Sequence, residues 1–108
     1  MKKKKNILVL HGDNQDAETL KGRMKPMLTK LQDSVQFDFL DAPFVVQDAK
    51  EPTKRQWWTQ VKHTLEWDHD TGHESIKLIS DFIRKTYNPD TRKLDAILGF
   101  SQGGCILQ

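Results

Sequence analysis

The sequence predicts one α/β domain in which helices flank a parallel β-sheet with three recognisable strands. Residues 6–10 form a continuous aliphatic run, which is typical of a parallel strand buried on both faces. Residues 94–100 form a second short apolar run, and segments with helical spacing separate the predicted strands. Strands that alternate with helices indicate a parallel sheet. The 108 residues suffice for one domain with a modest core.

Charge and composition narrow the range of partners. The net charge of +2 includes four lysines at positions 2–5, and subtracting their charges leaves −2 for the rest. This balance gives no case for nucleic-acid binding, and we expect residues 1–5 to be a solvated basic tail, with a localisation signal as the alternative. The single cysteine, Cys105, fits a reducing compartment. No apolar stretch is long enough to span a bilayer or to act as a signal peptide. We therefore expect a cytoplasmic protein, with a nuclear location left open, no cofactor, and an undetermined oligomeric state.

The next segment predicts a helix followed by a strand. Asp16 is suited to cap the helix, and Pro26 predicts that it kinks or begins afresh. Residues 35–39 alternate with period two, which predicts the second strand, and residues 41–43 end it. The apolar residues at helical spacing are Leu20, Met24, Met27, Leu28 and Leu31.

Residues 44–72 show only weak periodicity. We expect a long, lid-like excursion with a short helix near residues 55–67, because long connections in compact domains usually serve function. Thr71 and Glu74 match a capping box for the helix that follows, which should end near Tyr87. The predicted buried face of that helix comprises Ile76, Ile79, Phe82 and Ile83.

The third predicted strand leads into Gly99-Phe100-Ser101-Gln102-Gly103, a G-x-S-x-G pattern. In a nucleophile elbow of this pattern, a serine stands on a tight strand-to-helix turn whose neighbours must lack bulk. Gly99 and Gly103 supply that clearance, and the residues after Ser101 can open a helix. The alternatives are an ordinary glycine-rich turn and a phosphate-binding loop, although no G-x-G-x-x-G spacing and no Gly-Lys-Ser/Thr is present.

Several separated motifs agree along the chain. They are Leu10-His11-Gly12, Gln15, Asp41-Ala42-Pro43, Arg55 with Trp57-Trp58, and Gly99-Phe100-Ser101-Gln102-Gly103. Together these motifs resemble the FSH family, which comprises largely fungal eukaryotic serine hydrolases of the α/β-hydrolase fold. The resemblance covers essentially the whole chain after the lysines, and it implies hydrolysis of carboxylic esters or thioesters, with a small-molecule acyl substrate.

The resemblance also assigns roles. Ser101 would attack the acyl carbonyl and form an acyl-enzyme. The backbone N–H groups of Gln102 and Asp13 would form the oxyanion hole. Asp13 departs from the bulky or apolar residue usual at its position in the family. Its carboxylate should therefore face solvent, because a negative charge inside the site would oppose the oxyanion.

Other residues have competing interpretations. His11 would belong to the oxyanion loop, with a structural role rather than that of a general base. His11, Trp57 and Trp58 are candidate pocket residues, although the two tryptophans could equally pack the excursion onto the domain. The polar residues around His69 and His73 suggest a metal site only weakly, because a third ligand at convincing spacing is missing, so we predict no metal. Cys105 is expected to be a small buried helix residue.

No acid and no histidine follow Ser101, although an α/β-hydrolase triad runs in the order serine, acid, histidine. We therefore expect residues 1–108 to be the N-terminal portion of a single hydrolase domain, a partial α/β-hydrolase fold that stops after the nucleophile elbow. The chain alone should be inactive. Two function classes stay open: a serine hydrolase, and a non-catalytic or vestigial binding module on the same fold.

Overall fold

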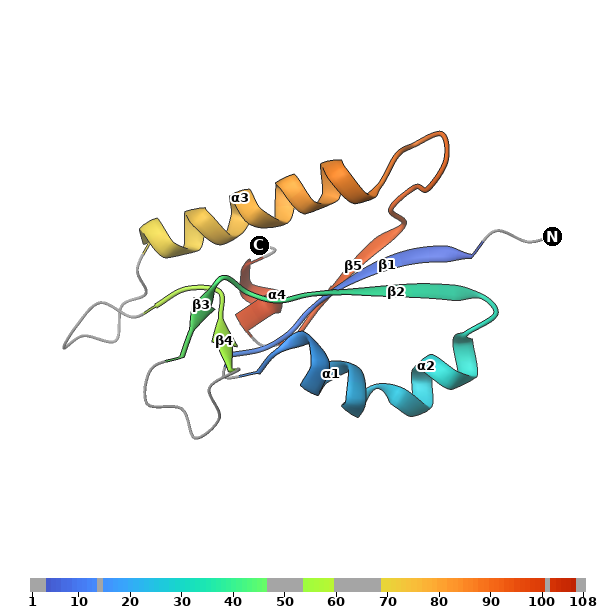
Figure 1. Cartoon of the computed structure of the whole chain (residues 1–108), viewed down its shortest axis with the longest axis horizontal. Coiled ribbons are helices and arrows are strands. Elements are labelled where there is room, and N and C mark those ends of the chain that lie inside the picture. The colour runs from blue at the N-terminus through green and yellow to red at the C-terminus, as the bar shows by residue number, and fades with distance from the viewer. Residues whose placement is uncertain (1–3, 14, 47–53, 60–68, 101, 107–108) are drawn as a thin grey trace.

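A computed structural model describes residues 4–13, 15–46, 54–59, 69–100 and 102–106 of the chain (Figure 1). Helices and strands alternate along much of it, as the sequence predicts. The elements are β1 (Lys5–Leu10), α1 (Ala17–Arg23), α2 (Lys25–Leu31), β2 (Val35–Leu40), β3 (Phe44–Val45), β4 (Arg55–Gln56), α3 (His69–Thr86), β5 (Ala96–Gly99) and α4 (Gln102–Ile106). Along the described residues, no helix is both long and apolar enough to cross a membrane.

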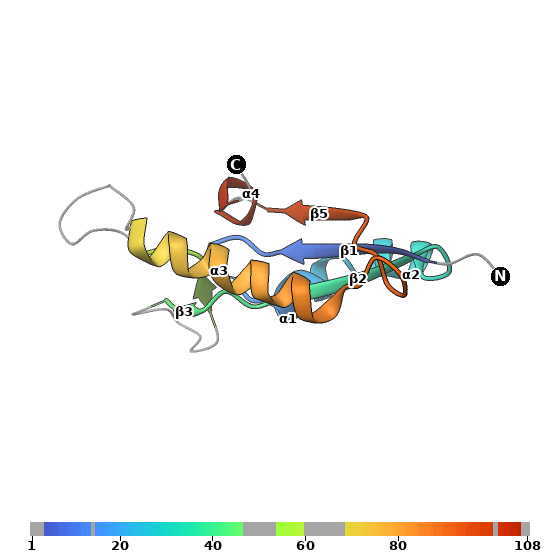
Figure 2. The same cartoon turned by 90° about the horizontal axis from the view of Figure 1, so that it is seen from above.

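The main sheet has three parallel strands in the order β2-β1-β5, which confirms the predicted fold class (Figure 2). Leu10, the last residue of β1, pairs with Leu40 on β2 and with Gly99 on β5. The carboxyl ends of all three strands therefore meet at one edge of the sheet. Leu8 and Val9 have no exposed surface, as expected of a strand covered on both faces.

Helices cover the two faces of β1 (Figure 1). On one face, Leu20 of α1 and Met24, the C-cap of that helix, pack with Val9. On the other face, Ile79 of α3 and Ile106 of α4 share a second cluster. That cluster is completed by Leu8, Leu10, Ala42 and Trp57. Trp57 comes from the excursion, in the part where the sequence predicts a short helix.

The helical segment after β1 follows its predicted start and its predicted break. The Asp16 carboxylate accepts a hydrogen bond from the backbone N–H of Thr19 at 2.6 Å, so Asp16 caps α1. The helix then begins afresh rather than kinking: α1 ends at Arg23, Met24 joins the two, and Pro26 lies in the first turn of α2. Proline is tolerated there because the first-turn N–H groups have no partner within the helix.

The segment between β2 and α3 differs from the sequence prediction. Residues 55–59 are not helical: Arg55–Gln56 form β4, which pairs antiparallel with β3, while residues 60–68 lie outside the described residues. Each strand of this pair has two residues, too few for a recognisable periodicity. The excursion is therefore attached to the domain by a short hairpin of its own.

The start of α3 and its buried face also need correction. The helix begins at His69, two residues before the predicted cap Thr71, whose hydroxyl instead accepts the N–H of Thr59 at 2.9 Å. Ile76 is 44% exposed, whereas Ser75 is fully buried. The buried face of the first half of α3 is thus shifted by one residue, because Ser75 is needed there for a hydrogen bond to Trp57.

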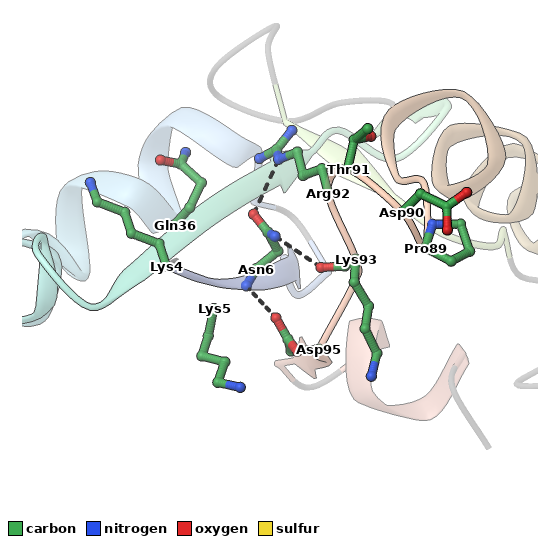
Figure 3. A pocket seen from close by; sticks show the side chains of 10 residues that line it. All are labelled: Lys4, Lys5, Asn6, Gln36, Pro89, Asp90, Thr91, Arg92, Lys93 and Asp95. Atoms are coloured by element: carbon green, nitrogen blue, oxygen red, sulfur yellow. Dashed lines mark hydrogen bonds between the residues drawn. The ribbon is translucent and has the colours of Figure 1, made fainter. Parts of the chain in front are cut away.

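A polar network holds the amino-terminal end of the sheet together. The Tyr87 hydroxyl and the Arg92 guanidinium both donate to the Asp38 carboxylate, each at 2.6 Å. Arg92 also donates to the side chain of Asn6, whose amide nitrogen donates to the Lys93 carbonyl, and the backbone N–H of Asn6 donates to the Asp95 carboxylate (Figure 3). These contacts join β1, β2 and the loop before β5 beside a cavity of about 640 Å³.

This network predicts a stability change at alkaline pH. Burial, together with the Asp38 carboxylate, raises the pKa of Tyr87 above its ordinary value of 10.0. The unfolded chain therefore loses the phenol proton first, and the free energy of unfolding should fall as the pH rises above about 10. Chemical denaturation of Tyr87→Phe should show a loss of about 1 kcal/mol at pH 8 and a smaller further loss above pH 10 than the unmodified chain. Equal alkaline slopes for the two proteins would contradict this assignment.

Candidate active site

The candidate site lies where β5 gives way to α4, beside the end of β1. The strand ends at Gly99 and the helix begins at Gln102, so Phe100 and Ser101 separate the two elements in the sequence. Ser101 itself lies outside the described residues. The turn is anchored on both sides: Phe100 N–H donates to the Leu10 carbonyl at 3.0 Å, and Gly103 N–H donates to the Phe100 carbonyl at 2.8 Å.

Glycine is required at two positions of this turn because backbone segments touch there. A Cβ added to Gly103 would lie 2.5 Å from the carbonyl oxygens of both Leu10 and His11. A Cβ at Gly99 would lie 2.6 Å from the backbone of Gly104. Real Cβ atoms essentially never approach backbone that closely. The first turn of α4 therefore rests directly on the ends of β1 and β5.

Trp57 packs against this junction and is completely buried. Its indole N–H donates to the His11 carbonyl at 2.7 Å, and its ring stacks on the His11 ring with centroids 5.1 Å apart. Its backbone N–H donates to the side-chain oxygen of Gln102 at 2.5 Å. Trp57 is therefore a core residue that joins the excursion to the end of β1 and to α4.

His11 is buried, and backbone groups occupy both of its ring nitrogens. The Nε2 atom accepts the N–H of Ala42 at 2.9 Å, so the proton resides on Nδ1, which donates to the Gly12 carbonyl at 2.7 Å. Burial is the main cause that lowers the pKa of His11 below 6.5. A neutral imidazole with both nitrogens engaged orients the loop after β1.

The loop after β1 is held from its other side by the short hairpin. The Gly12 N–H donates to the side-chain oxygen of Gln15 at 2.8 Å, and the Gln15 carbonyl accepts the N–H of Arg55 at 2.7 Å. Asp13 is exposed, as a carboxylate beside an oxyanion would need to be. Since Gln15 takes the Gly12 N–H, the Asp13 N–H remains the predicted donor of this loop.

The structure thus brings together His11, Trp57 and Gln102, with the half-buried Trp58 nearby. The Trp58 carbonyl accepts from the side-chain nitrogen of Gln102 at 3.5 Å. His63 lies outside the described residues, and His73 is exposed on α3. Among the described residues, no group of three or more His, Cys, Asp or Glu side chains could hold a metal ion. Cys105 falls within α4.

Sequence reasoning missed two side chains of this junction. Ser75 donates its hydroxyl to the Trp57 carbonyl, and the Gln102 amide bridges the two tryptophans. Ser75 lies one position before the predicted apolar face, which begins at Ile76, so the sequence offers no signal for its burial. The side-chain role of Gln102 had no signal, because the motif assigns this residue only a backbone function.

A family model described as "Serine hydrolase (FSH1)" matches residues 1–108. The chain belongs to this serine hydrolase family. The family is one of α/β-hydrolases, so the parallel sheet with its flanking helices is a partial α/β-hydrolase fold. The resemblance recognised from the separated motifs is confirmed.

Individual relatives resemble the chain along nearly all of its length. Esterase CG5412 of Drosophila melanogaster is 30% identical over 96% of the chain and 39% of its own length. Esterase AGAP003155 of Anopheles gambiae is 28% identical over 96% of the chain and 41% of its own. Rhodanese-like domain-containing protein 6 of Arabidopsis thaliana is 27% identical over 97% of the chain and 22% of its own length. The chain thus spans about two fifths of the length of these esterases.

The close approach at the turn can be tested with alanine. Gly103→Ala and Gly99→Ala should each lower the free energy of unfolding by about 1–3 kcal/mol, since the backbone must shift to admit the methyl group. Gly22→Ala is the matched control, because nothing lies within 4 Å of a Cβ at that helical position. It should raise the free energy of unfolding by about 0.5 kcal/mol. Urea denaturation measures the free energy of unfolding of all three variants. A Gly103→Ala variant as stable as the unmodified chain would contradict the close packing at this position.

The state of His11 can be measured by NMR titration of its ring nitrogens. The ring should stay neutral, with the proton on Nδ1, below the pH of about 6.5 at which a free histidine becomes protonated. Because the unfolded chain takes up this proton first, His11 should contribute to a fall in the free energy of unfolding as the pH drops below about 6.5. A midpoint at 6.5, or the Nε2-protonated tautomer, would show that the hydrogen bonds are misassigned.

Proposed function

We propose that this chain carries the nucleophile and the oxyanion hole of an enzyme that hydrolyses carboxylic esters or thioesters. The observation that carries the proposal is the seating of α4: its first turn touches the carbonyls of Leu10 and His11. This contact seats α4 on the end of β1, and the loop that contains Asp13 continues from that end. Membership of a serine hydrolase family and the naming of insect relatives as esterases support the same activity.

The proposed reaction proceeds through an acyl-enzyme. The Ser101 oxygen attacks the acyl carbonyl carbon, and the hydroxyl proton passes to a general base. Collapse of the tetrahedral intermediate breaks the bond to the alcohol or thiol, which leaves with that proton. Water then attacks the acyl-enzyme by the same steps, which frees the acid and restores Ser101. The N–H groups of Gln102 and Asp13 stabilise the oxyanion in both halves.

The general base is not His11. Its Nε2 accepts the Ala42 N–H, and its Nδ1 proton is donated to the Gly12 carbonyl, so neither nitrogen is available to Ser101. No other histidine or acid follows Ser101 within residues 102–108. Loss of the triad histidine costs on the order of a millionfold in rate. The chain spans about two fifths of the length of the esterases that it matches. We therefore propose that turnover belongs to a full-length protein of that extent rather than to residues 1–108 alone.

A non-catalytic binding module on the same fold is the second candidate. The engagement of both His11 nitrogens is compatible with it, because a binding module needs no general base. A module of this kind would keep the glycine-rich turn and bind acyl compounds without forming a covalent bond to Ser101.

A fluorophosphonate probe separates the two candidates. The full-length protein should be labelled at Ser101, identified by peptide mass spectrometry, and Ser101→Ala should abolish the labelling. The 108-residue chain should label slower by orders of magnitude, because an unactivated serine is a weak nucleophile. Ser80→Ala, which changes a serine on α3, is the matched control and should label normally. Absence of labelling in the full-length protein would favour the binding module.

A further inference from the structure

All three polar groups of Trp57 form hydrogen bonds with residues around the turn. The indole N–H donates to the His11 carbonyl, the backbone N–H donates to the Gln102 side chain, and the carbonyl accepts from Ser75. The residue has no exposed surface and stacks on the His11 ring. One buried residue thus connects the end of β1 with the beginning of α4.

The Gln102 side chain uses both ends of its amide in this arrangement. The oxygen accepts the Trp57 N–H at 2.5 Å, and the nitrogen donates to the Trp58 carbonyl at 3.5 Å. An amide can accept from one backbone unit and donate to the next, and a neutral carboxylic acid of the same shape can do the same. Gln102 is 9% exposed, so leaving the Trp57 N–H unpaired here would be costly.

Gln102 is also the first residue of α4, and its backbone N–H is one of the two predicted oxyanion donors. The second donor, Asp13, lies two residues after His11, whose carbonyl holds the indole of Trp57. A continuous chain of hydrogen bonds therefore runs from the loop of one donor, through Trp57, to the side chain of the other. These hydrogen bonds act in addition to the direct contact of Gly103 with the end of β1.

We propose that the Gln102 side chain is a positioning group that, by holding Trp57, fixes the spacing between the two oxyanion donors. The inference rests on the proposed function and adds a second role to a residue known in that function only by its backbone. The donors engage charge that develops in the transition state, so their misplacement lowers kcat and leaves KM unchanged. An error of about 1 Å in such a site costs roughly a hundredfold in rate.

Gln102→Glu tests the positioning role through the pH dependence of kcat, a quantity that a residue needed only for stability would not change. A protonated glutamic acid has the shape of glutamine and can still accept from Trp57 and donate to Trp58. The ionised form only accepts, and it adds negative charge beside the oxyanion. Burial raises the pKa of such a glutamate, so lowering the pH should restore the neutral form.

The experiment measures kcat and KM of the full-length protein for p-nitrophenyl butyrate at pH 8 and pH 5.5. At pH 8, Gln102→Glu should have a kcat about a hundredfold below that of the unmodified protein, with KM unchanged. The ratio of the two kcat values should shrink markedly at pH 5.5. Gln102→Met, which cannot be rescued by a proton, should keep its deficit at both values.

Two further variants complete the design. Gln36→Glu adds the same charge at an exposed position on β2 and should match the unmodified protein at both pH values. Trp57→Phe keeps an aromatic ring but removes the indole N–H to His11 together with part of the ring volume, so it should lower kcat with KM unchanged. Thermal unfolding of each variant shows whether it folds. If the Gln102 variants do not fold, the kcat and KM of Trp57→Phe test the positioning role instead.

The outcomes separate the inference from the proposed function. If the unmodified full-length protein labels at Ser101 but the Gln102→Glu ratio does not depend on pH, the positioning role is overturned and the hydrolase stands. A deficit that appears in KM instead of kcat also overturns it, because substrate binding would then be affected. If the unmodified protein neither labels nor turns over, both proposals fall together.

Discussion

The constraint on which the rest depends is the contact between the first turn of α4 and the carbonyls that end β1. Because a Cβ at Gly103 would lie 2.5 Å from the Leu10 and His11 oxygens, only glycine allows the helix to sit there. This seating requires β5 to run parallel to β1 and to end level with it, which the pairing of Leu10 with Gly99 provides. The sheet, the turn and the helix are thus parts of one arrangement.

The same contact explains why a tryptophan from a distant segment is buried at the junction. Once α4 rests on β1, the His11 carbonyl and the Gln102 side chain lie close enough for a single residue to bond both. Trp57 does so, and Ser75 of α3 secures it from behind. The excursion between β2 and α3 therefore supplies part of the wall of the site, and His11 is shaped into a neutral structural residue by the same packing.

Much of the fold could be predicted because its signals are local. The aliphatic run of β1 and the Asp16 cap act through immediate neighbours in the sequence. The glycines around Ser101 can be recognised from their spacing alone, although Gly103 is required by its contact with the distant end of β1. What could not be predicted depends on partners far away along the chain. The hairpin of β3 and β4 is too short to show a period. The capping-box pattern predicts Thr71 as a helix cap, and nothing local reveals that its hydroxyl accepts the N–H of Thr59. The exchange of Ile76 for Ser75 on the buried face follows from Trp57, which lies in a segment without periodicity.

The central claim is that an oxyanion formed at residue 101 is held between the backbone N–H groups of Gln102 and Asp13. A crystal structure of the full-length protein after reaction with a fluorophosphonate tests it most directly, since the phosphonyl oxygen occupies the oxyanion position. The account predicts that this oxygen lies about 2.7–3.1 Å from both nitrogens, with the Asp13 carboxylate turned to solvent. A phosphonyl oxygen that points into solvent, or that is held by other donors, would contradict it.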